Sequence, residues 1–581
     1  MKNVSNSTIA KLLHEIGEYL AMQDVPFKPR AYEKAADAIE NVDDDLSEIY
    51  KTGGIKALEN IPGVGASIGE KIEEFLKTGR IAYHEELKKK EPVDLSGLAK
   101  VEGLGPKSIK HLYEKLGVKN LADLESAARN GKIAKLAGFG EKSEEKILKG
   151  VSFAKSYRGR FVLGSVMPEI RLIEGRLQKL LGVSNIIVAG SVRRRKETVG
   201  DADILIVSKN ASPIMDSFTA MPEVVAVIAH GKTKSSVKLA SGINIDLRVV
   251  PEESYGAALN YFTGSKDHNV ALRSLAVKNG WKLNEYGLFK KQRGSAQAWK
   301  MIAGRTEEEL YKKFGMDYIE PELRENTGEL EVALSHMLPK LIGYDDLQGD
   351  LQVQTDWTDG ADSIETMAKT AIVHGLKYIA ITDHTKRLAM THGLDEKRIL
   401  KQMAEIDRLN KKFAGKIKIL KGSECDILKD GSLDLDDAVL SKLDVVGVAV
   451  HSLFNLSRED QTERIRRAIT NRNADILFHP TGRIINRREA YDVDIDTIIG
   501  VAKKTGTIME IDAFPDRLDL KDEYIRKCID SGVKMSIDSD AHSSDHFSCL
   551  EYGIAQARRG WATKESIINA RPLEKMMRCL K

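Results

Sequence analysis

Three aspartates in the first half of the chain have the types and spacing of a metal-dependent transfer site. Asp201 and Asp203 lie two residues apart at the start of a strand-like segment, 202–207, so their side chains should share one face, about 6–7 Å apart. Asp246 alternates with apolar residues in another strand-like segment, 243–248. Carboxylates on neighbouring strands suit a pair of Mg²⁺ ions, which stabilise both the attacking and the leaving oxygen of an in-line displacement. We therefore expect these three aspartates to be catalytic and to hold the metals.

A glycine- and arginine-rich segment comes just before these aspartates. Gly190 and Ser191 predict a tight turn where the backbone can approach a phosphate, and Arg194 can neutralise charge on a triphosphate. By itself, the basic run 193–196 is typical of a solvated face, and a lone Asp-x-Asp pair is typical of a polar strand end. The fixed offset between this segment and the aspartates favours a site that transfers a nucleotidyl group.

The segment 190–203 resembles the nucleotidyltransferase signature of the DNA polymerase beta superfamily. The stretches 261–265 and 284–288 resemble segments of the family X DNA polymerases, and the first of them contacts the sugar of the incoming nucleotide in that family. The resemblance covers residues 1–320. It implies that the aspartates hold Mg²⁺ or Mn²⁺ and that Asp246 assists deprotonation of the primer 3′-hydroxyl. Lys266 departs from the pattern, because polymerase beta has an acidic residue there, and this change should alter nucleotide binding.

The same resemblance assigns binding residues. Tyr261 would help to exclude ribonucleotides, and Arg248 and Arg273 would contact DNA, the latter on the template side. The residues implied to bind the nucleotide are Gly190, Ser191, Arg194, Gly200, Tyr261, Phe262, Gly264 and Asn269.

Residues 1 to about 150 have helical periodicity that is interrupted by three glycine signals, at 61–65, 101–105 and 136–140, roughly 35–40 residues apart. Each signal is followed by a helix-like segment with Lys and Ser. The three resemble helix-hairpin-helix motifs, whose backbone N–H groups bind a DNA phosphate without reading bases. The glycines implied to contact DNA are Gly63, Gly65, Gly103, Gly105, Gly138 and Gly140.

Lys71 follows the first glycine signal and matches the Schiff-base lysine of the family's 5′-deoxyribose-phosphate lyase. Such a lysine needs a neutral amine, and therefore a pKa lowered by burial or by neighbouring cations. Ser67 stands where polymerase beta has another lysine. The alternative, that Lys71 is a surface lysine touching a phosphate, is slightly favoured.

Histidine is concentrated in the second half of the chain, where eight of the 13 histidines follow residue 330. Strand-like segments at 377–381, 417–420, 445–450, 475–478, 507–511 and 533–537 alternate with helix-like stretches, which predicts a parallel α/β sheet or barrel. Metal-ligand residue types follow most of these strands, and active sites of α/β barrels form at the carboxyl ends of strands. The candidate ligands are Asp359, His384, Glu424, His451, His479, Asp540 and His542.

This half resembles the polymerase-and-histidinol-phosphatase (PHP) domain over about 340–575. In family X polymerases that domain resembles a distorted barrel with up to three metal ions and can remove nucleotides from a DNA 3′ end. The family opens with Asp-Leu-His-x-His, whereas segment 350–354 of this chain reads Asp-Leu-Gln-Val-Gln. Because Gln352 and Gln354 suit Zn²⁺ or Mn²⁺ less well than imidazole does, we expect weaker metal occupancy and reduced or absent 3′–5′ exonuclease activity.

The chain has 581 residues, of which 42% are hydrophobic and 30% charged, with a net charge of +3, so a multidomain protein of mixed α+β and α/β fold is expected. Four cysteines without a Cys-x-x-Cys pair argue against a cysteine-based zinc site or a disulfide framework. No signal peptide or membrane span is evident, so we expect a cytoplasmic monomer that binds DNA and deoxynucleoside triphosphates. The expected divisions are a helical DNA-binding domain at 1–85, a helix-hairpin-helix subdomain at 86–152, a palm at 153–255, a thumb-like subdomain at 256–320, a linker at 321–344 and the PHP domain at 345–581.

Three functions are consistent with these features. The favoured one is a DNA polymerase that fills short gaps in repair and carries an attenuated nuclease domain. The second is a nuclease or phosphoesterase acting at DNA 3′ ends, with the polymerase half used only for docking. The third is a non-catalytic scaffold. The complete set of polymerase carboxylates and the altered nuclease opening motif argue against the second and third.

Overall fold

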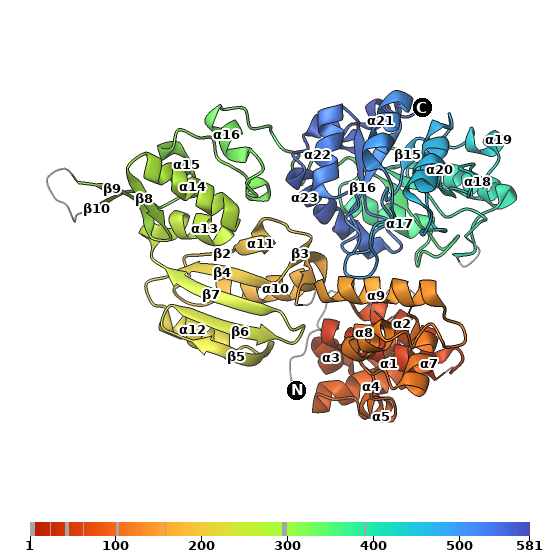
Figure 1. Cartoon of the computed structure of the whole chain (residues 1–581), viewed down its shortest axis with the longest axis horizontal. Helices are drawn as coiled ribbons and strands as arrows, with labels where there is room; N and C mark the ends of the chain where they lie inside the picture. The colour runs from red at the N-terminus through yellow and green to blue at the C-terminus, as the bar shows by residue number, and fades with distance from the viewer. Residues whose placement is uncertain are drawn as a thin grey trace.

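The structure is a computed structural model of the full chain. It describes residues 6–581 except 24, 41–45, 62, 100, 102–103, 157–158, 293–298 and 389–390. In Figure 1 the chain forms a helical unit, a palm, a thumb and a barrel domain in that order.

The helical unit is held together by one hydrophobic core, which extends from Ile9 in the first helix to Val151 in the last. The amphipathic spacing expected from the sequence therefore buries a single apolar face of each helix against its neighbours. The expected boundary near residue 85 lies within this shared core. The helices are α1 (Asn6–Met22), α2 (Lys28–Glu40), α3 (Leu46–Glu59), α4 (Ala66–Thr78), α5 (Ala82–Lys90), α6 (Leu95–Leu98), α7 (Pro106–Leu116), α8 (Leu121–Arg129) and α9 (Glu141–Ser156).

The palm is a five-stranded sheet with the order β2-β4-β7-β6-β5. Its strands are β2 (Asn185–Val188), β4 (Asp201–Val207), β5 (Val224–His230), β6 (Lys234–Leu239) and β7 (Asn244–Val250), and a short pair is formed by β1 (Phe161–Val162) and β3 (Thr198–Val199). The expected strands at 202–207 and 243–248 are confirmed, with Ile245 and Leu247 buried. The palm helices are α10 (Leu163–Gln178), the short α11 (Gly190–Arg193) and α12 (Ser212–Thr219).

The thumb follows directly and has its own core, which includes Leu272, Leu288 and Leu310. It consists of the turn η1 (Glu252–Ser254), α13 (Tyr255–Thr263), α14 (Lys266–Lys278), β8 (Trp281–Asn284), β9 (Gly287–Lys291), β10 (Trp299–Ala303) and α15 (Glu307–Lys313).

The segment 321–344, expected to be a linker, folds onto the thumb. It contains η2 (Pro321–Leu323) and α16 (Glu329–Leu334), and Leu323 and Leu330 join the thumb core. Glu329 is buried and contacts His268 of the thumb at 2.7 Å. The segment therefore connects the thumb to the barrel through packed structure.

The barrel domain is a parallel sheet in which seven strands follow one another in chain order, and Val353 of β11 also bridges to Ala541, three residues after β17 ends. The sheet is thus nearly closed, as the alternating pattern predicted. The strands are β11 (Gly349–Val353), β12 (Tyr378–Ile381), β13 (Lys418–Asp426), β14 (Val445–Ala449), β15 (Ile476–Leu477), β16 (Ile508–Asp512) and β17 (Met535–Asp538). The helices are α17 (Ile364–Val373), α18 (Glu396–Lys412), α19 (Asp437–Leu440), α20 (Arg458–Thr470), α21 (Ile495–Thr505), α22 (Asp522–Ser531), α23 (Leu550–Arg559) and α24 (Leu573–Met577).

Ion pairs join the barrel domain to the polymerase half. Arg171 of α10 contacts Glu551 of α23 at 2.7 Å, and Arg558 of the same helix contacts Glu322 at 2.7 Å. Close packing adds to these contacts, because a Cβ on Gly164 would lie 2.4 Å from Pro515. Among the described residues, none of the helices has the length and apolar character needed to span a bilayer.

Candidate functional site

The palm brings the predicted carboxylates together on adjacent strands. β4 and β7 are parallel, and Asp203 lies directly opposite Asp246 in their register. Asp201 is exposed on the same face of β4, so all three carboxylates are close enough to influence one another. Burial, reinforced by Asp201 and Asp246, raises the pKa of Asp203 to about 7. Carboxylates that repel one another in this way fit divalent cations, which would neutralise them.

Gly190 allows the predicted nucleotide-binding turn to lie against this cluster. Its φ is +65°, and a Cβ at this position would come within 2.6 Å of an oxygen of Asp203. Only glycine can therefore place α11 so close to the carboxylate. Ser191 is the second residue of α11, and Gly200 immediately precedes β4, so the predicted phosphate-binding residues border the carboxylates.

The basic run 193–196 is not the solvated face that its charge alone suggested. Arg193 binds Glu307 at 2.7 Å, and Arg194 binds Glu325 at 3.1 Å. Both arginines are mostly buried, with side chains 14% and 13% exposed. The run of basic residues alone suggested an exposed surface, because the acidic partners that bury it lie more than a hundred residues away in the sequence.

The thumb gathers three predicted nucleotide- or DNA-binding residues around one small pocket lined by Tyr261, Asn269 and Arg273. The Asn269 side chain donates to the Tyr261 carbonyl at 2.7 Å, and the Arg273 side chain donates to the Asn269 carbonyl at 3.2 Å. The Phe262 ring lies 4.5 Å from the guanidinium of Arg248, which is on β7 two residues after Asp246. This stacking connects the thumb pocket to the strand that carries a catalytic candidate.

The predicted DNA-binding glycines lie at helix N-termini. Gly65 and Gly105 immediately precede α4 and α7, and neither helix start is capped by a side chain. The first N–H groups of α4 can therefore meet a phosphate, whereas α7 begins with Pro106, which has no N–H to donate. Gly63 and Gly138 have φ of +81° and +86°, as hairpin turns require, and Gly140 immediately precedes α9. Gly103 lies outside the described residues.

Lys71 lies on α4 among aromatic and hydroxyl groups. Its Nζ donates to Ser67 Oγ at 3.1 Å and lies 5.2 Å from the centre of the Tyr83 ring and 6.0 Å from that of Tyr32. Burial lowers the pKa of Lys71, assisted by the charge of Lys28 and opposed by neighbouring glutamates. This direction fits the requirement of a Schiff-base amine, and the half-buried position fits a phosphate contact as well.

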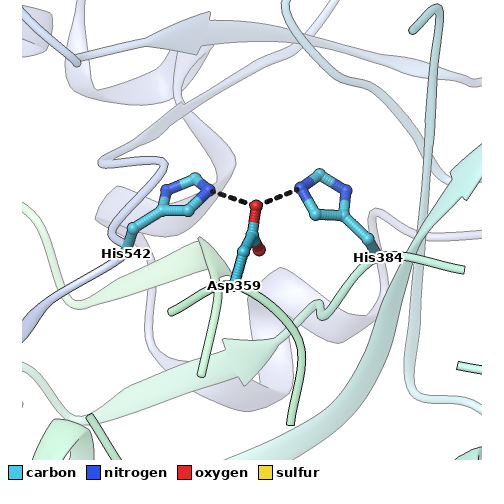
Figure 2. Close-up of side chains that lie close together, drawn as sticks. All are labelled: Asp359, His384 and His542. Atoms are coloured by element: carbon cyan, nitrogen blue, oxygen red, sulfur yellow. Dashed lines mark ion pairs between the residues drawn. The ribbon is translucent and has the colours of Figure 1, made fainter. Parts of the chain in front are cut away.

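The barrel places the predicted metal ligands in two groups that share His384. In the first group, shown in Figure 2, Asp359 lies between His384 and His542, with N–O distances of 3.6 and 3.8 Å. In the second, Glu424 contacts His384 at 3.4 Å and His451 at 2.9 Å. His479 is also 2.8 Å from Glu424. Because the ligand atoms of each group lie within 4.8 Å of one another, each group fits a divalent cation.

The imidazoles control the charge of the second group. Burial would raise the pKa of Glu424, but the imidazoles of His384 and His451 hold it well below its usual range. Burial lowers the pKa of His384, whereas Glu424 and Asp426 outweigh burial and raise the pKa of His451 to about 9. Binding of a cation by His451 would therefore release a proton.

The two glutamines and Asp540 are all buried in the barrel domain, but their side chains have different partners. The Gln354 amide donates to Glu424 at 2.7 Å, so a hydrogen-bond donor lies on a predicted metal-ligand oxygen. Gln352 is fully buried, and neither of its polar side-chain atoms has a hydrogen-bond partner within the described part of the chain. Asp540 pairs with Arg517 at 3.4 Å. The chain thus assembles Asp359, His384, Glu424, His451, His479 and His542 around the two groups and pairs Asp540 with a guanidinium.

Comparison with known proteins assigns each of these regions. A helix-hairpin-helix domain matches residues 4–81, a SAM-like helix-hairpin-helix tandem matches 95–151, a DNA polymerase beta thumb matches 258–325 and a PHP domain matches 350–545. Over 576 residues, 99% of either chain, the sequence is 38% identical to the DNA polymerase/3′-5′ exonuclease PolX of Bacillus subtilis. The chain belongs to the family X DNA polymerases.

Partial relatives reflect the composite architecture of this family X polymerase. DNA polymerase lambda of Rattus norvegicus is 24% identical over 343 residues, 55% of this chain and 56% of its own. A probable phosphatase of Thermoanaerobacter is 30% identical over 217 residues, 36% of this chain and 83% of its own. The predicted helix-hairpin-helix motifs, thumb and PHP domain are thereby confirmed.

Several polar residues beside the predicted ligands were not among the residues predicted from the sequence. Lys234 of β6 contacts Asp246 at 2.8 Å, and with Ser236 it outweighs burial and lowers the pKa of that carboxyl. Glu510 and Asp512 alternate on β16 in the barrel and are fully buried, and Arg517 contacts Asp512 at 3.5 Å. Acidic residues within an apolar strand were a usable signal for the barrel pair, whereas nothing in the sequence indicated the partner of Lys234.

Proposed function

We propose that this family X polymerase extends a primer 3′-hydroxyl across short DNA gaps, with Asp201, Asp203 and Asp246 holding two Mg²⁺ or Mn²⁺ ions. The observation that carries the proposal is the register that sets Asp203 opposite Asp246 beside the Gly190 turn. The ions, when bound, supply charge stabilisation for phosphoryl displacement. Lys234 keeps Asp246 ionised, which suits a carboxylate that accepts a proton from the primer hydroxyl.

The substrates follow from the surrounding residues. Gly190, Ser191, Arg194 and Gly200 bind the triphosphate, and the thumb residues Tyr261, Phe262, Gly264 and Asn269 bind the sugar and base of the incoming nucleotide. Arg248, Arg273 and the helix-hairpin-helix glycines contact DNA. Uncapped helix N-termini bind phosphates without reading sequence, so binding should depend strongly on salt and little on base identity. We propose a monomer as the acting unit, because one chain carries the palm carboxylates, the thumb residues and the helix-hairpin-helix motifs together.

We propose that the PHP domain retains a divalent-cation site, occupied by Mn²⁺ or Zn²⁺, and a weakened 3′–5′ exonuclease activity. The support for weakening is local. Gln354 donates a hydrogen bond to Glu424, and Arg517 pairs with Asp540, so the negative charge of both carboxylates is already partly neutralised. The two groups that share His384 are left for metal binding.

A test of the polymerase assignment uses a labelled primer on 5′-phosphorylated gapped DNA with Mg²⁺ and deoxynucleotides. Asp203→Asn should lower the extension rate by about a hundredfold or more, because a metal-binding charge is lost. Asp216→Asn, at an exposed palm aspartate, is the matched control and should extend normally. Extension that survives in Asp203→Asn would contradict the proposed site.

The same substrate without deoxynucleotides tests the alternative that the chain is chiefly a 3′-end nuclease. Slow shortening in Mn²⁺ that is abolished by Glu424→Gln would support a weakened PHP nuclease. Shortening faster than extension would favour the alternative, with the polymerase half used for docking. Absence of shortening would contradict the proposed exonuclease activity.

A further inference from the structure

The loop that carries the nucleotidyltransferase signature packs against the barrel domain. Arg559, the last residue of α23, donates to the Arg194 carbonyl at 3.0 Å. Arg483 of the barrel contacts Glu197 of the same loop at 2.7 Å. The predicted phosphate-binding loop of the polymerase is therefore in direct contact with a domain that carries a different metal site.

Glu325 is the centre of this contact. Its Oε1 accepts hydrogen bonds from Arg194 at 3.1 Å and from Arg559 at 3.0 Å, and Lys196 lies 4.0 Å away. Arg559 is 3% exposed, and its other terminal nitrogen binds Asp522 of α22. Arg194 of the palm, Glu325 and Arg559 of the barrel thus form one chain of charges that is largely shielded from solvent, with side chains 13%, 21% and 3% exposed.

This chain of charges determines how the Arg194 side chain points. Its Nε donates to Glu325 and its Nη1 donates to the carbonyl of Thr263, so two of the three guanidinium nitrogens already have partners in the protein. In the described part of the chain, Nη2 makes no hydrogen bond with protein, which leaves it for an anionic ligand. A Cβ on Gly264 would lie 3.0 Å from Nη1, so the guanidinium is also confined sterically.

We propose that Arg559 of the barrel domain is a positioning residue for nucleotide binding, acting through Glu325 on Arg194. The inference rests on the proposed role of Arg194 as a triphosphate ligand. An arginine side chain loses considerable rotamer entropy when it is ordered. Because the Glu325 contact already orders Arg194 in the free enzyme, nucleotide binding does not have to meet that entropic cost. Without Arg559, Glu325 is no longer held from the barrel side, so it fixes the Arg194 guanidinium less well and that ordering must be supplied when the nucleotide binds.

The test measures single-nucleotide gap filling by the full-length enzyme at several deoxynucleotide concentrations. Arg559→Met should raise the deoxynucleotide KM about five- to tenfold, the range expected for coupling between residues in contact, with kcat changed by about twofold or less. Arg559→Lys, which keeps the charge, should recover part of the loss. Arg171→Gln breaks another ion pair between palm and barrel and should leave KM unchanged.

A double-mutant cycle distinguishes positioning from general stabilisation of the domain interface. If Arg559 acts through Glu325, then Arg559→Met should have little further effect on KM in a Glu325→Ala background. Additive effects, or an unchanged KM in a folded Arg559→Met variant, would overturn the proposal. If Arg559→Met does not fold, as judged by thermal unfolding, Glu325→Ala decides, since Glu325 is at the edge of the interface with 21% exposure. A raised KM in Glu325→Ala would support the proposal, and an unchanged or lowered KM would overturn it.

The proposal and the function on which it rests fail in different ways. Gap filling that persists in Asp203→Asn would refute the proposed function. Gap filling that is lost in Asp203→Asn, together with a normal KM in Arg559→Met, would leave the polymerase site standing and refute the coupling alone.

Discussion

Glu307 lies buried between two arginines, and the loss of stability on its replacement can be worked out from these contacts. Its carboxylate contacts Arg193 at 2.7 Å and also accepts hydrogen bonds from Arg324 and from the Tyr318 hydroxyl. Glu307 is 3% exposed and Arg324 is fully buried. Glu307→Gln preserves the shape of the side chain but leaves two guanidinium groups without their carboxylate.

Two independent arguments give similar values for the stability that is lost in Glu307→Gln. Removing one partner of a buried ion pair costs about 3–5 kcal/mol, because the remaining charge is left uncompensated. Although burial would raise it, Arg324 and Arg193 lower the pKa of Glu307 from 4.5 to about 2. At about 1.4 kcal/mol per pKa unit this difference stabilises the fold by roughly 3 kcal/mol at neutral pH.

The sign of the pH dependence follows from the lowered pKa. Because the folded pKa is below the unfolded one, the stabilisation is complete above about pH 4.5 and is lost as the pH falls towards about 2. The stability difference between wild type and Glu307→Gln should therefore shrink by roughly 1 kcal/mol between pH 7 and pH 4.

Hydrogen exchange of thumb amides in the full-length chain measures this difference, since a multidomain protein does not unfold in a single step. Amides of α13 and α15 should lose about 3 kcal/mol of protection at pH 7 in Glu307→Gln. Glu308→Gln, at the exposed neighbouring residue, is the control. Equal protection in wild type and Glu307→Gln at pH 7, or a difference that does not shrink at pH 4, would refute the reasoning.

Three further predictions concern the other sites. Lys71→Ala should abolish borohydride trapping on DNA that ends in a 5′-deoxyribose phosphate, whereas a wild-type chain that is not trapped would support the phosphate-contact alternative. Glu424→Gln should reduce bound metal by about one ion per chain, measured by mass spectrometry of the desalted protein; unchanged content would contradict the second ligand group. Gln354→His should tighten Mn²⁺ binding about tenfold in calorimetric titration, and equal affinity would show that Gln354 is not what limits occupancy.

The sequence was informative wherever short-range patterns determine the structure. Alternation of apolar residues located β7, because a strand with one buried face needs that period, and continuous apolar runs located β4 and the barrel strands, which are buried on both faces. The spacing of Asp201 and Asp203 predicted a shared face, and the structure places them there. Ligand types that follow successive barrel strands predicted a common site, because the carboxyl ends of parallel strands meet at one edge of the sheet.

What escaped prediction depends on partners that are distant in sequence. The run 193–196 was typical of a solvated surface, but Glu307 and Glu325 bury its first two arginines. The segment 321–344 was expected to be a connector because it is polar, yet its polar residues are the ones that pair inside the fold. Arg324 is fully buried against Glu307, and Glu329 against His268.

These long-range pairs have a functional consequence. Arg193 and Arg194 are consecutive, yet Arg193 is fixed by Glu307 of the thumb and Arg194 by Glu325, which the barrel domain holds through Arg559. The loop between Gly190 and Asp201, the first of the predicted catalytic aspartates, is therefore held from two directions. A change in the packing of the thumb reaches the predicted triphosphate loop through Arg193, and a change in the packing of the barrel reaches it through Arg194 and Glu197. Nucleotide affinity should therefore respond to domain packing more strongly than DNA affinity does.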